Sequence, residues 1–211
     1  MNHKHYSELL PAHKVEGKMI VNIKGTNGSG KSTVPQLMRE IDEEFFTIWC
    51  DTFGQKEIIA TVFPQLGWLA LGSYHNKCGG CDGLDSGDII NQCIRLTWLL
   101  DYNVLFEGVI VADIKSTYHN LLHSINNDPR YPKRRTIMLF PTTPLEECLR
   151  RVSERNGGKP VKEDLIATKY ANNMKAKEWY LQEGKLEVLD LDTSGEREEM
   201  LQKFLETVGE L

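Results

Sequence analysis

Residues 25–32 constrain this chain more than any other stretch, because they fit the pattern G-x-x-x-x-G-K-[ST] of a phosphate-binding loop. The apolar run 19–24 before the loop is typical of a buried parallel strand, and residues 33–41 after it have helix-forming composition. Glycines let backbone N–H groups turn inward around phosphate oxygens, and the following helix points the positive end of its dipole at the anion. We therefore expect Lys31 to contact the β- and γ-phosphates of ATP and Ser32 to hold Mg²⁺. The expected nucleotide-binding residues are Gly25, Thr26, Asn27, Gly28, Ser29, Gly30, Lys31, Ser32 and Thr33.

Apolar runs and helical patterns alternate along the rest of the chain. Strands are expected at 45–50, 104–106, 136–140 and 185–190, and helices at 88–101, 116–126, 144–155, 162–182 and 196–208. A further helical segment is expected near 55–63, and 66–72 is expected to be extended or hairpin-like. Alternation of this kind predicts a three-layer α/β/α fold of the P-loop NTPase type, with a parallel sheet covered by helices on both faces. Residues 1–18 are expected to form a polar extension, and 19–211 a single domain.

The formal net charge of −5 argues against a protein that binds nucleic acid through bulk charge alone. Basic residues nevertheless gather in 115–135 and 150–162, which is compatible either with a positive face around the phosphate chemistry or with a mixed, solvated surface. The polar first 18 residues do not resemble a signal peptide, and no run is long enough to span a membrane. The five scattered cysteines lack the spacing of a disulfide scaffold, so we expect a cytosolic protein.

Two acidic residues follow expected strands, at the edge of the sheet where ligands of such folds bind. Asp51 comes directly after the strand at 45–50 and is a candidate general base, although a helix cap or a turn is a common alternative use. Glu107 comes directly after the strand at 104–106, where a carboxylate suits the water shell of Mg²⁺ or the substrate. Its alternative is a solvent-exposed carboxylate at a strand end. The expected metal-holding residues are thus Ser32 and Glu107.

Arg151 and Arg155 lie four residues apart on the expected helix 144–155, so they share one face of it. Gly157 and Gly158 then break the helix. This pattern predicts a lid around 150–162 whose guanidinium groups close over a transferring phosphoryl group. Surface salt bridges are the alternative use of these arginines.

The segment 71–83 is rich in glycine and cysteine, and we expect it to bind the substrate. Its glycines allow close backbone approach, Tyr74 offers an aromatic face for a base, and Asp82 is a second candidate base. The expected substrate-binding residues are Tyr74, Cys78, Gly79, Gly80, Asp82 and Glu107. As an alternative, His75, Cys78 and Cys81 are spaced like three ligands of a zinc ion, but a second C-x-x-C is lacking.

The phosphate-binding loop, the Phe106-Glu107-Gly108 stretch and the lid arginines together resemble those of the P-loop nucleoside and nucleotide kinases, from about residue 19 to 208. The segment 71–82 is similar to one in bacteriophage kinases that phosphorylate 5-hydroxymethyluracil within DNA. The resemblance implies an enzyme of the host cytoplasm that transfers the γ-phosphate of ATP, with Mg²⁺, to the hydroxymethyl oxygen of a modified pyrimidine in DNA. Asp51 resembles the post-strand aspartate of polynucleotide kinases, but no arginine follows it within three or four residues. The alternatives are a kinase of free nucleosides or nucleoside monophosphates, and a nucleotide-dependent switch protein, which the lid arginines disfavour.

Overall fold

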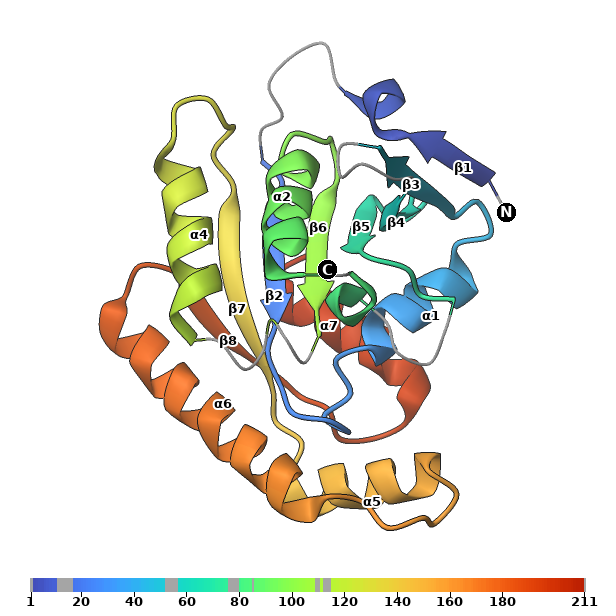
Figure 1. The fold of residues 1–211 in the computed structure, drawn as a ribbon, viewed down its shortest axis with the longest axis vertical. Coiled ribbons are helices and arrows are strands. Elements are labelled where there is room, and N and C mark those ends of the chain that lie inside the picture. Colours follow the sequence, from blue (N-terminus) through green and yellow to red (C-terminus); the bar gives the residue numbers. More distant parts are fainter. Residues whose placement is uncertain are drawn as a thin grey trace.

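The structure is a computed structural model, and it describes residues 2–10, 17–51, 57–75, 80–84, 86–108, 111 and 115–210. Eight strands form one sheet in the order β1-β3-β4-β5-β6-β2-β7-β8 (Figure 1). The strands are β1 (Asn2–His5), β2 (Met19–Ile23), β3 (Phe46–Cys50), β4 (Glu57–Phe63), β5 (Trp68–Leu71), β6 (Asn103–Glu107), β7 (Arg135–Pro141) and β8 (Glu187–Leu191). Strand β2, which leads into the phosphate-binding loop, is fully buried and pairs in parallel with β6 and β7.

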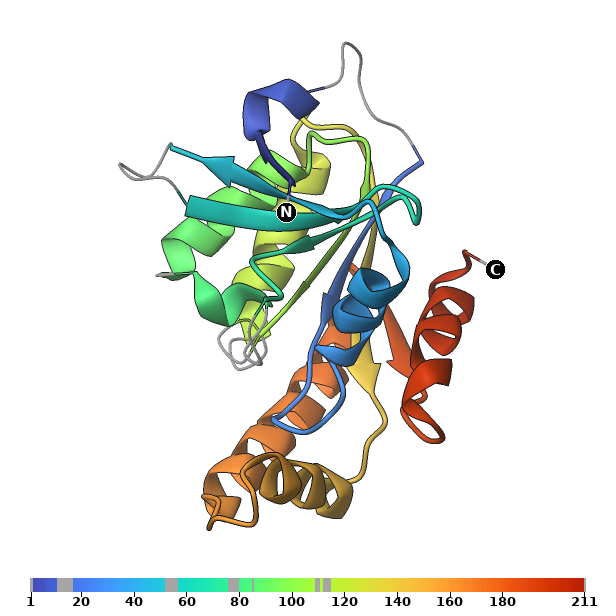
Figure 2. The same ribbon diagram turned by 90° about the vertical axis from the view of Figure 1, so that its right-hand side faces the viewer.

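Helices cover both faces of the sheet, as the alternating pattern predicts. They are α1 (Thr33–Ile41), α2 (Gly87–Thr97), α4 (Lys115–Asn127), α5 (Leu145–Arg155), α6 (Glu163–Glu183) and α7 (Met200–Val208), with 3-10 turns at Tyr6–Leu9, Gly80–Gly83 and Arg197–Glu199. Helices α1 and α7 lie on one side of the sheet, and α2 and α4 on the other (Figure 2). Among the described residues, none of these helices combines the length and apolar character that a membrane span requires.

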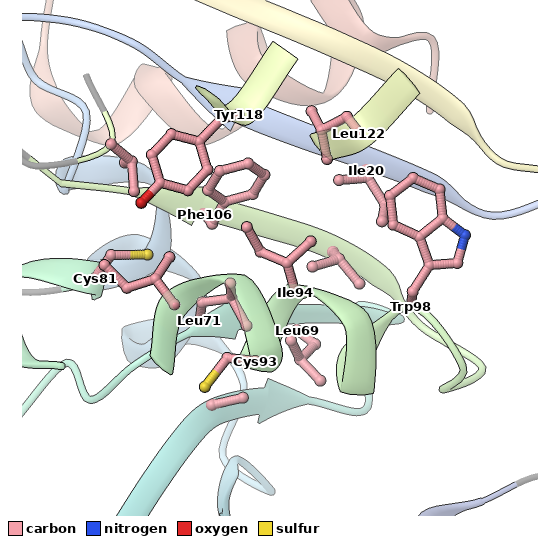
Figure 3. Close-up of a cluster of buried hydrophobic side chains, with 14 of the residues drawn as sticks. Ile20, Leu69, Leu71, Cys81, Cys93, Ile94, Trp98, Phe106, Tyr118 and Leu122 are labelled. Carbon is pink, nitrogen blue, oxygen red and sulfur yellow. The ribbon is translucent and has the colours of Figure 1, made fainter. Parts of the chain in front are cut away.

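The core is divided into two clusters by the sheet, because successive strand residues point to opposite faces. Ile20 of β2 and Phe106 of β6 pack against Ile94 of α2, Trp98 just after α2, and Tyr118 of α4 (Figure 3). The neighbouring β2 residues, Val21 and Ile23, face α1 and α7 instead. Burial on both faces fixes the end of β2, and with it the start of the phosphate-binding loop.

Strand β4 is where the sequence prediction of a helix near 55–63 was wrong. These residues pair antiparallel with both β3 and β5, so the sheet is parallel except for this strand. Residues 59–63 are buried, and the β-branched side chains of Ile58, Ile59, Thr61 and Val62 favour a strand that packs on both faces. The expectation that 66–72 is extended or hairpin-like is confirmed, because β5 lies within this stretch and forms an antiparallel hairpin with β4.

The first residues of the chain also differ from the polar extension that we expected. Residues 2–5 form the edge strand β1, which pairs in parallel with β3. Tyr6 is buried beside it, and its hydroxyl donates a hydrogen bond to the carbonyl oxygen of Leu96, 3.0 Å away. This part of the N-terminal segment therefore belongs to the same sheet as the phosphate-binding loop.

Candidate active site

A pocket of ≈ 670 Å³ lies beyond the carboxyl end of β2, between the phosphate-binding loop, helix α5 and the segment after β8. Four of the five residues expected to be catalytic line this one pocket: Lys31, Asp82, Arg151 and Arg155. The fifth, Asp51, does not. The full lining comprises Asn27, Gly28, Ser29, Gly30, Lys31, Ser32, Thr33, Gln36, Asp82, Glu147, Arg150, Arg151, Arg155, Thr193, Gly195, Arg197 and Met200.

The phosphate-binding loop has the strained backbone that its glycines allow. Gly28 and Gly30 adopt φ angles of 81° and 88°, in the left-handed region that other residues rarely enter. A Cβ on Gly28 would overlap the carbonyl oxygen of Cys148, so the loop packs directly against the backbone of α5. The side-chain oxygens of Asn27 and Ser29 are buried and have no hydrogen-bond partner in the structure. They line the pocket, where a polar ligand would satisfy them.

Lys31 is only 6% exposed, and its ammonium group donates a hydrogen bond to the carbonyl oxygen of Thr26 at 3.2 Å. Burial lowers the pKa of Lys31, and the nearby carboxylates of Glu107 and Asp82 oppose that shift. This buried cation therefore lines the pocket and interacts electrostatically with two acidic groups.

Glu107, at the end of β6, is 1% exposed, so the alternative of a solvent-exposed carboxylate at a strand end is wrong. Its Oε2 accepts a hydrogen bond from Ser32 Oγ at 3.1 Å, and its Oε1 accepts one from Tyr74 Oη at 3.3 Å. Burial raises the pKa of Glu107, whereas Lys31 and the two hydroxyl groups lower it. The structure thus brings together the two residues that the sequence named for the metal, Ser32 and Glu107.

The segment expected to bind the substrate is tied closely to the end of β6. A Cβ on Gly80 would overlap the carbonyl oxygen of Glu107, and one on Gly108 would lie 2.9 Å from Asp82 Oδ1. Tyr74 is only 2% exposed, which contradicts the expectation that its ring is open to stack on a base. Its side chain instead points its hydroxyl at Glu107.

Cys78 and Gly79, also named for substrate binding, lie outside the described residues. Cys81 is fully buried, and burial raises the pKa of its thiol well above the usual value. Within the described ranges, there is no group of three or more His, Cys, Asp or Glu residues that could hold a metal ion. The zinc alternative includes Cys78, which lies outside these ranges, so it stays a prediction.

The two candidate bases lie in different places. Asp82 is exposed at the pocket, next to Lys31. The side chain of Asp51 is 72% exposed and pairs with His5 Nε2 at 3.6 Å. Strands β4, β5 and β6 separate β3 from β2, which places the end of β3 about 19 Å from the phosphate-binding loop at roughly 4.8 Å per strand. The inserted β4–β5 hairpin is the physical reason why Asp51 does not reach the pocket.

One of the two lid arginines, Arg151, is held by a carboxylate that sequence reasoning missed. Glu147 accepts hydrogen bonds from Arg151 Nε at 2.6 Å and from Arg150 Nε, also at 2.6 Å. These hydrogen bonds lower the pKa of Glu147 to about 2. Arg151 also donates to the carbonyl oxygen of Thr193 at 3.3 Å, which links α5 to the segment after β8. The i,i+4 spacing of Glu147 and Arg151 on a helix predicts this ion pair from the sequence alone.

Three further pocket residues, Thr193, Gly195 and Arg197, had no such signal, because their place depends on how β8 ends beside the loop. Arg197 forms an ion pair with Glu40 of α1 at 2.7 Å. This contact ties the segment after β8 to the helix that follows the phosphate-binding loop.

The basic stretch 130–135 runs up to the first residue of β7, at the end of the strands opposite the pocket, and so does not join the pocket as a positive face. The remaining six residues of β7, 136–141, separate this stretch from the pocket end of the strand, a length of about 20 Å. Arg130 pairs with Asp128 and Arg135 with Glu187. Arg134 is 4% exposed and donates hydrogen bonds to the carbonyl oxygens of Trp98 and Tyr102, where it closes the end of α2.

The sheet order, the phosphate-binding loop after β2 and the arginine-bearing helix over that loop define an α/β protein of the P-loop kinase class. The family model for the 5-hmdU DNA kinases matches residues 9–182. The chain belongs to this family.

Relatives of the chain come from several bacteriophages. A 5-hmdU DNA kinase of Bacillus phage SP10 is 38% identical over 154 residues, which are 72% of this chain and 23% of that protein. The 5-hmdU DNA kinase 1 of Salmonella phage ViI is 35% identical over 152 residues, 70% of this chain and 64% of that protein. The matched part is thus less than two thirds of the length of either relative. Among solved structures, a deoxyadenosine kinase from M. mycoides is similar with a TM-score of 0.47 and 13% identity, over 92% of this chain and 100% of that one.

Proposed function

We propose that this protein transfers the γ-phosphate of ATP to the hydroxymethyl oxygen of 5-hydroxymethyluracil in phage DNA, in the cytoplasm of the host. Membership of the 5-hmdU DNA kinase family supports the acceptor. The observation that carries the chemistry is the pocket in which Lys31, Asp82, Arg151 and Arg155 meet. A triphosphate and a hydroxyl acceptor need these groups: fixed cations for the phosphates and one carboxylate for the proton.

Each residue has a role that follows from its place in the pocket. Lys31 and the backbone N–H groups of the loop hold the β- and γ-phosphates. Asp82 accepts the proton of the hydroxymethyl group as its oxygen forms a bond to the γ-phosphorus and the bond to the β-phosphate oxygen breaks, which releases ADP. Arg151 and Arg155 stabilise the charge that develops on the transferred group. Asp82 is preferred to Asp51 as the base because it alone of the two lines the pocket.

Ser32 and Glu107 fit a magnesium site, since both offer oxygen atoms and lie in hydrogen-bond contact beside the pocket wall. When bound, Mg²⁺ supplies positive charge that neutralises the β- and γ-phosphates. The chain's own contribution is to hold the Ser32 hydroxyl at the start of α1 and the Glu107 carboxylate at the end of β6.

Acceptor recognition is assigned to the segment that carries Asp82. Gly80 and Asp82 lie against the end of β6, and Cys78 and Gly79 belong to the same stretch of sequence. In this assignment Tyr74 supports the segment from within the protein and does not stack on the base, because it is buried.

The proposal is tested by incubating the protein with γ-labelled ATP and Mg²⁺ and with three acceptors: DNA containing 5-hydroxymethyluracil, the same DNA with thymine, and the free nucleoside. We expect label on the first acceptor alone, and on the modified base after digestion. Label on the free nucleoside and not on DNA would assign the protein to the nucleoside kinases. Release of inorganic phosphate with no labelled acceptor would favour a nucleotide-dependent switch. Lys31→Ala serves as the inactive control.

A further inference from the structure

Tyr74 is a buried tyrosine whose hydroxyl points at the proposed metal-binding carboxylate. It follows β5, at the same edge of the sheet as the end of β6. Its ring is 2% exposed, and its Oη lies 3.3 Å from Glu107 Oε1. The proposed chemistry gives this hydroxyl no part, although a hydrogen bond in a buried, low-dielectric site is electrostatically stronger than one in water.

We propose that Tyr74 is a positioning residue that fixes the orientation of the Glu107 carboxylate and thereby sets the affinity of the metal site. The inference rests on the proposed role of Glu107 in holding the metal. Two donors on different elements hold the two carboxylate oxygens: Ser32 at the start of α1 donates to Oε2, and Tyr74 donates to Oε1. With both oxygens engaged, rotation of the carboxylate would break a hydrogen bond.

The backbone around Tyr74 is itself held in place, so its hydroxyl is a fixed donor. Arg39 Nη1 of α1 donates a hydrogen bond to the carbonyl oxygen of Tyr74 at 2.7 Å. On the other side, a Cβ on Gly80 would lie 3.0 Å from Tyr74 Oη and 2.6 Å from Glu107 Oε1. Only a residue without a side chain fits between the tyrosine and the carboxylate, and Gly80 has a φ of 64°, which also favours glycine.

Loss of the hydroxyl would leave Glu107 Oε1 without this donor in a residue that is only 1% exposed. Partners of this kind, which orient a ligand without touching the metal, change metal affinity by about 10–100-fold when they are removed. The Tyr74→Phe substitution removes one oxygen atom and keeps the ring that fills the core, so we expect about tenfold weaker metal binding.

The test measures Mn²⁺ binding to the protein with AMP-PNP by electron paramagnetic resonance, which needs no catalytic turnover. Tyr74→Phe is compared with Tyr6→Phe, which also removes the hydrogen bond of a buried tyrosine hydroxyl, but at the edge of the sheet. We expect about tenfold weaker Mn²⁺ binding in Tyr74→Phe, and unchanged binding in Tyr6→Phe. Mg²⁺ titrations of label transfer should show the same shift, with most of the turnover restored at saturating Mg²⁺.

Mn²⁺ binding by Tyr74→Phe within twofold of wild type would overturn the proposal, as would a weaker interaction with DNA at unchanged Mn²⁺ affinity. If Tyr74→Phe does not fold, Arg39→Gln carries the test, because it loosens the backbone of Tyr74 and should weaken Mn²⁺ binding in the same direction by a smaller factor. Unchanged Mn²⁺ binding in Glu107→Gln would remove the carboxylate from the metal site and the inference with it. Absence of label on DNA, with the Mn²⁺ response intact, would refute the acceptor assignment alone.

Discussion

Asp82→Asn and Asp51→Asn are the most informative pair of substitutions, because both carboxylates are candidate bases by sequence but only Asp82 lines the pocket. An asparagine keeps the shape of Asp82 beside Gly108 and removes its ability to take a proton. General-base catalysis contributes about 10²–10⁴-fold, or roughly 3–5 kcal/mol of activation free energy, so the turnover of Asp82→Asn should fall by that factor. Asp51 follows β3, whose end lies about 19 Å from the phosphate-binding loop across the sheet. Its exposed ion pair with His5 contributes about 0–1 kcal/mol to the free energy of unfolding.

The assay is single-turnover transfer of labelled phosphate to DNA containing 5-hydroxymethyluracil at saturating ATP, with AMP-PNP affinity measured in parallel. We expect Asp51→Asn to match wild type within twofold, and Asp82→Asn to lose at least 10²-fold in rate with AMP-PNP affinity retained. If Asp82→Asn keeps more than a tenth of the wild-type rate, Asp82 is not the base. A tenfold or greater loss in Asp51→Asn would mean that the strand order does not decide which carboxylate reacts.

Three further predictions concern the loop and the lid. Lys31→Ala should lower turnover by roughly two to four decades with an unchanged circular dichroism spectrum, and wild-type turnover would refute the nucleotide site. Arg151→Ala should reduce turnover about 10²–10³-fold but weaken ATP binding less when no acceptor is present, as measured by calorimetry; equal losses would make it a simple nucleotide contact. The last prediction concerns the free energy of unfolding, measured in urea. Gly184 has open space around it, so Gly184→Ala should lower this free energy by about 1–2 kcal/mol through backbone strain alone, whereas Gly28→Ala should lower it by about 2–5 kcal/mol because α5 must also move. Equal losses in the two variants would contradict the close packing of the phosphate-binding loop against α5.

The phosphate-binding loop and the strand before it could be predicted from the sequence because their information is local. The glycines at 28 and 30 are needed for the backbone of the loop itself, and the apolar run of β2 needs no knowledge of its neighbours. Glu107 and Ser32 were also brought together correctly, since both follow from the rule that parallel strands end at one edge.

Features that depend on the order of the strands in the sheet could not be predicted from the local sequence. The sequence pattern of β4 favours a helix near 55–63, and it does not indicate that a β4–β5 hairpin lies between β3 and β6 in the sheet. Tyr74 looked like a stacking residue because its sequence neighbours are glycines and polar residues, whereas its burial comes from α1 and β6 packing around it. The burial of Tyr74 is thus a result of tertiary packing, which the local sequence does not specify.

The burial of Arg134, at the end of the sheet opposite the pocket, affects how the protein would dissociate from DNA if it has the proposed function. Arg130, Arg134 and Arg135 make contacts within the fold, whereas the lid carries exposed cations, among them Arg155, Lys159 and Lys162, that could contact a DNA backbone. Each neutralised phosphate adds roughly 0.9 to the slope of log affinity against log salt, so a few contacts give a shallow slope and a loose complex. We expect the protein to dissociate after each transfer and to modify DNA distributively: early in the reaction, strands with many target bases carry single phosphates scattered among them, and runs of neighbouring phosphates appear only late.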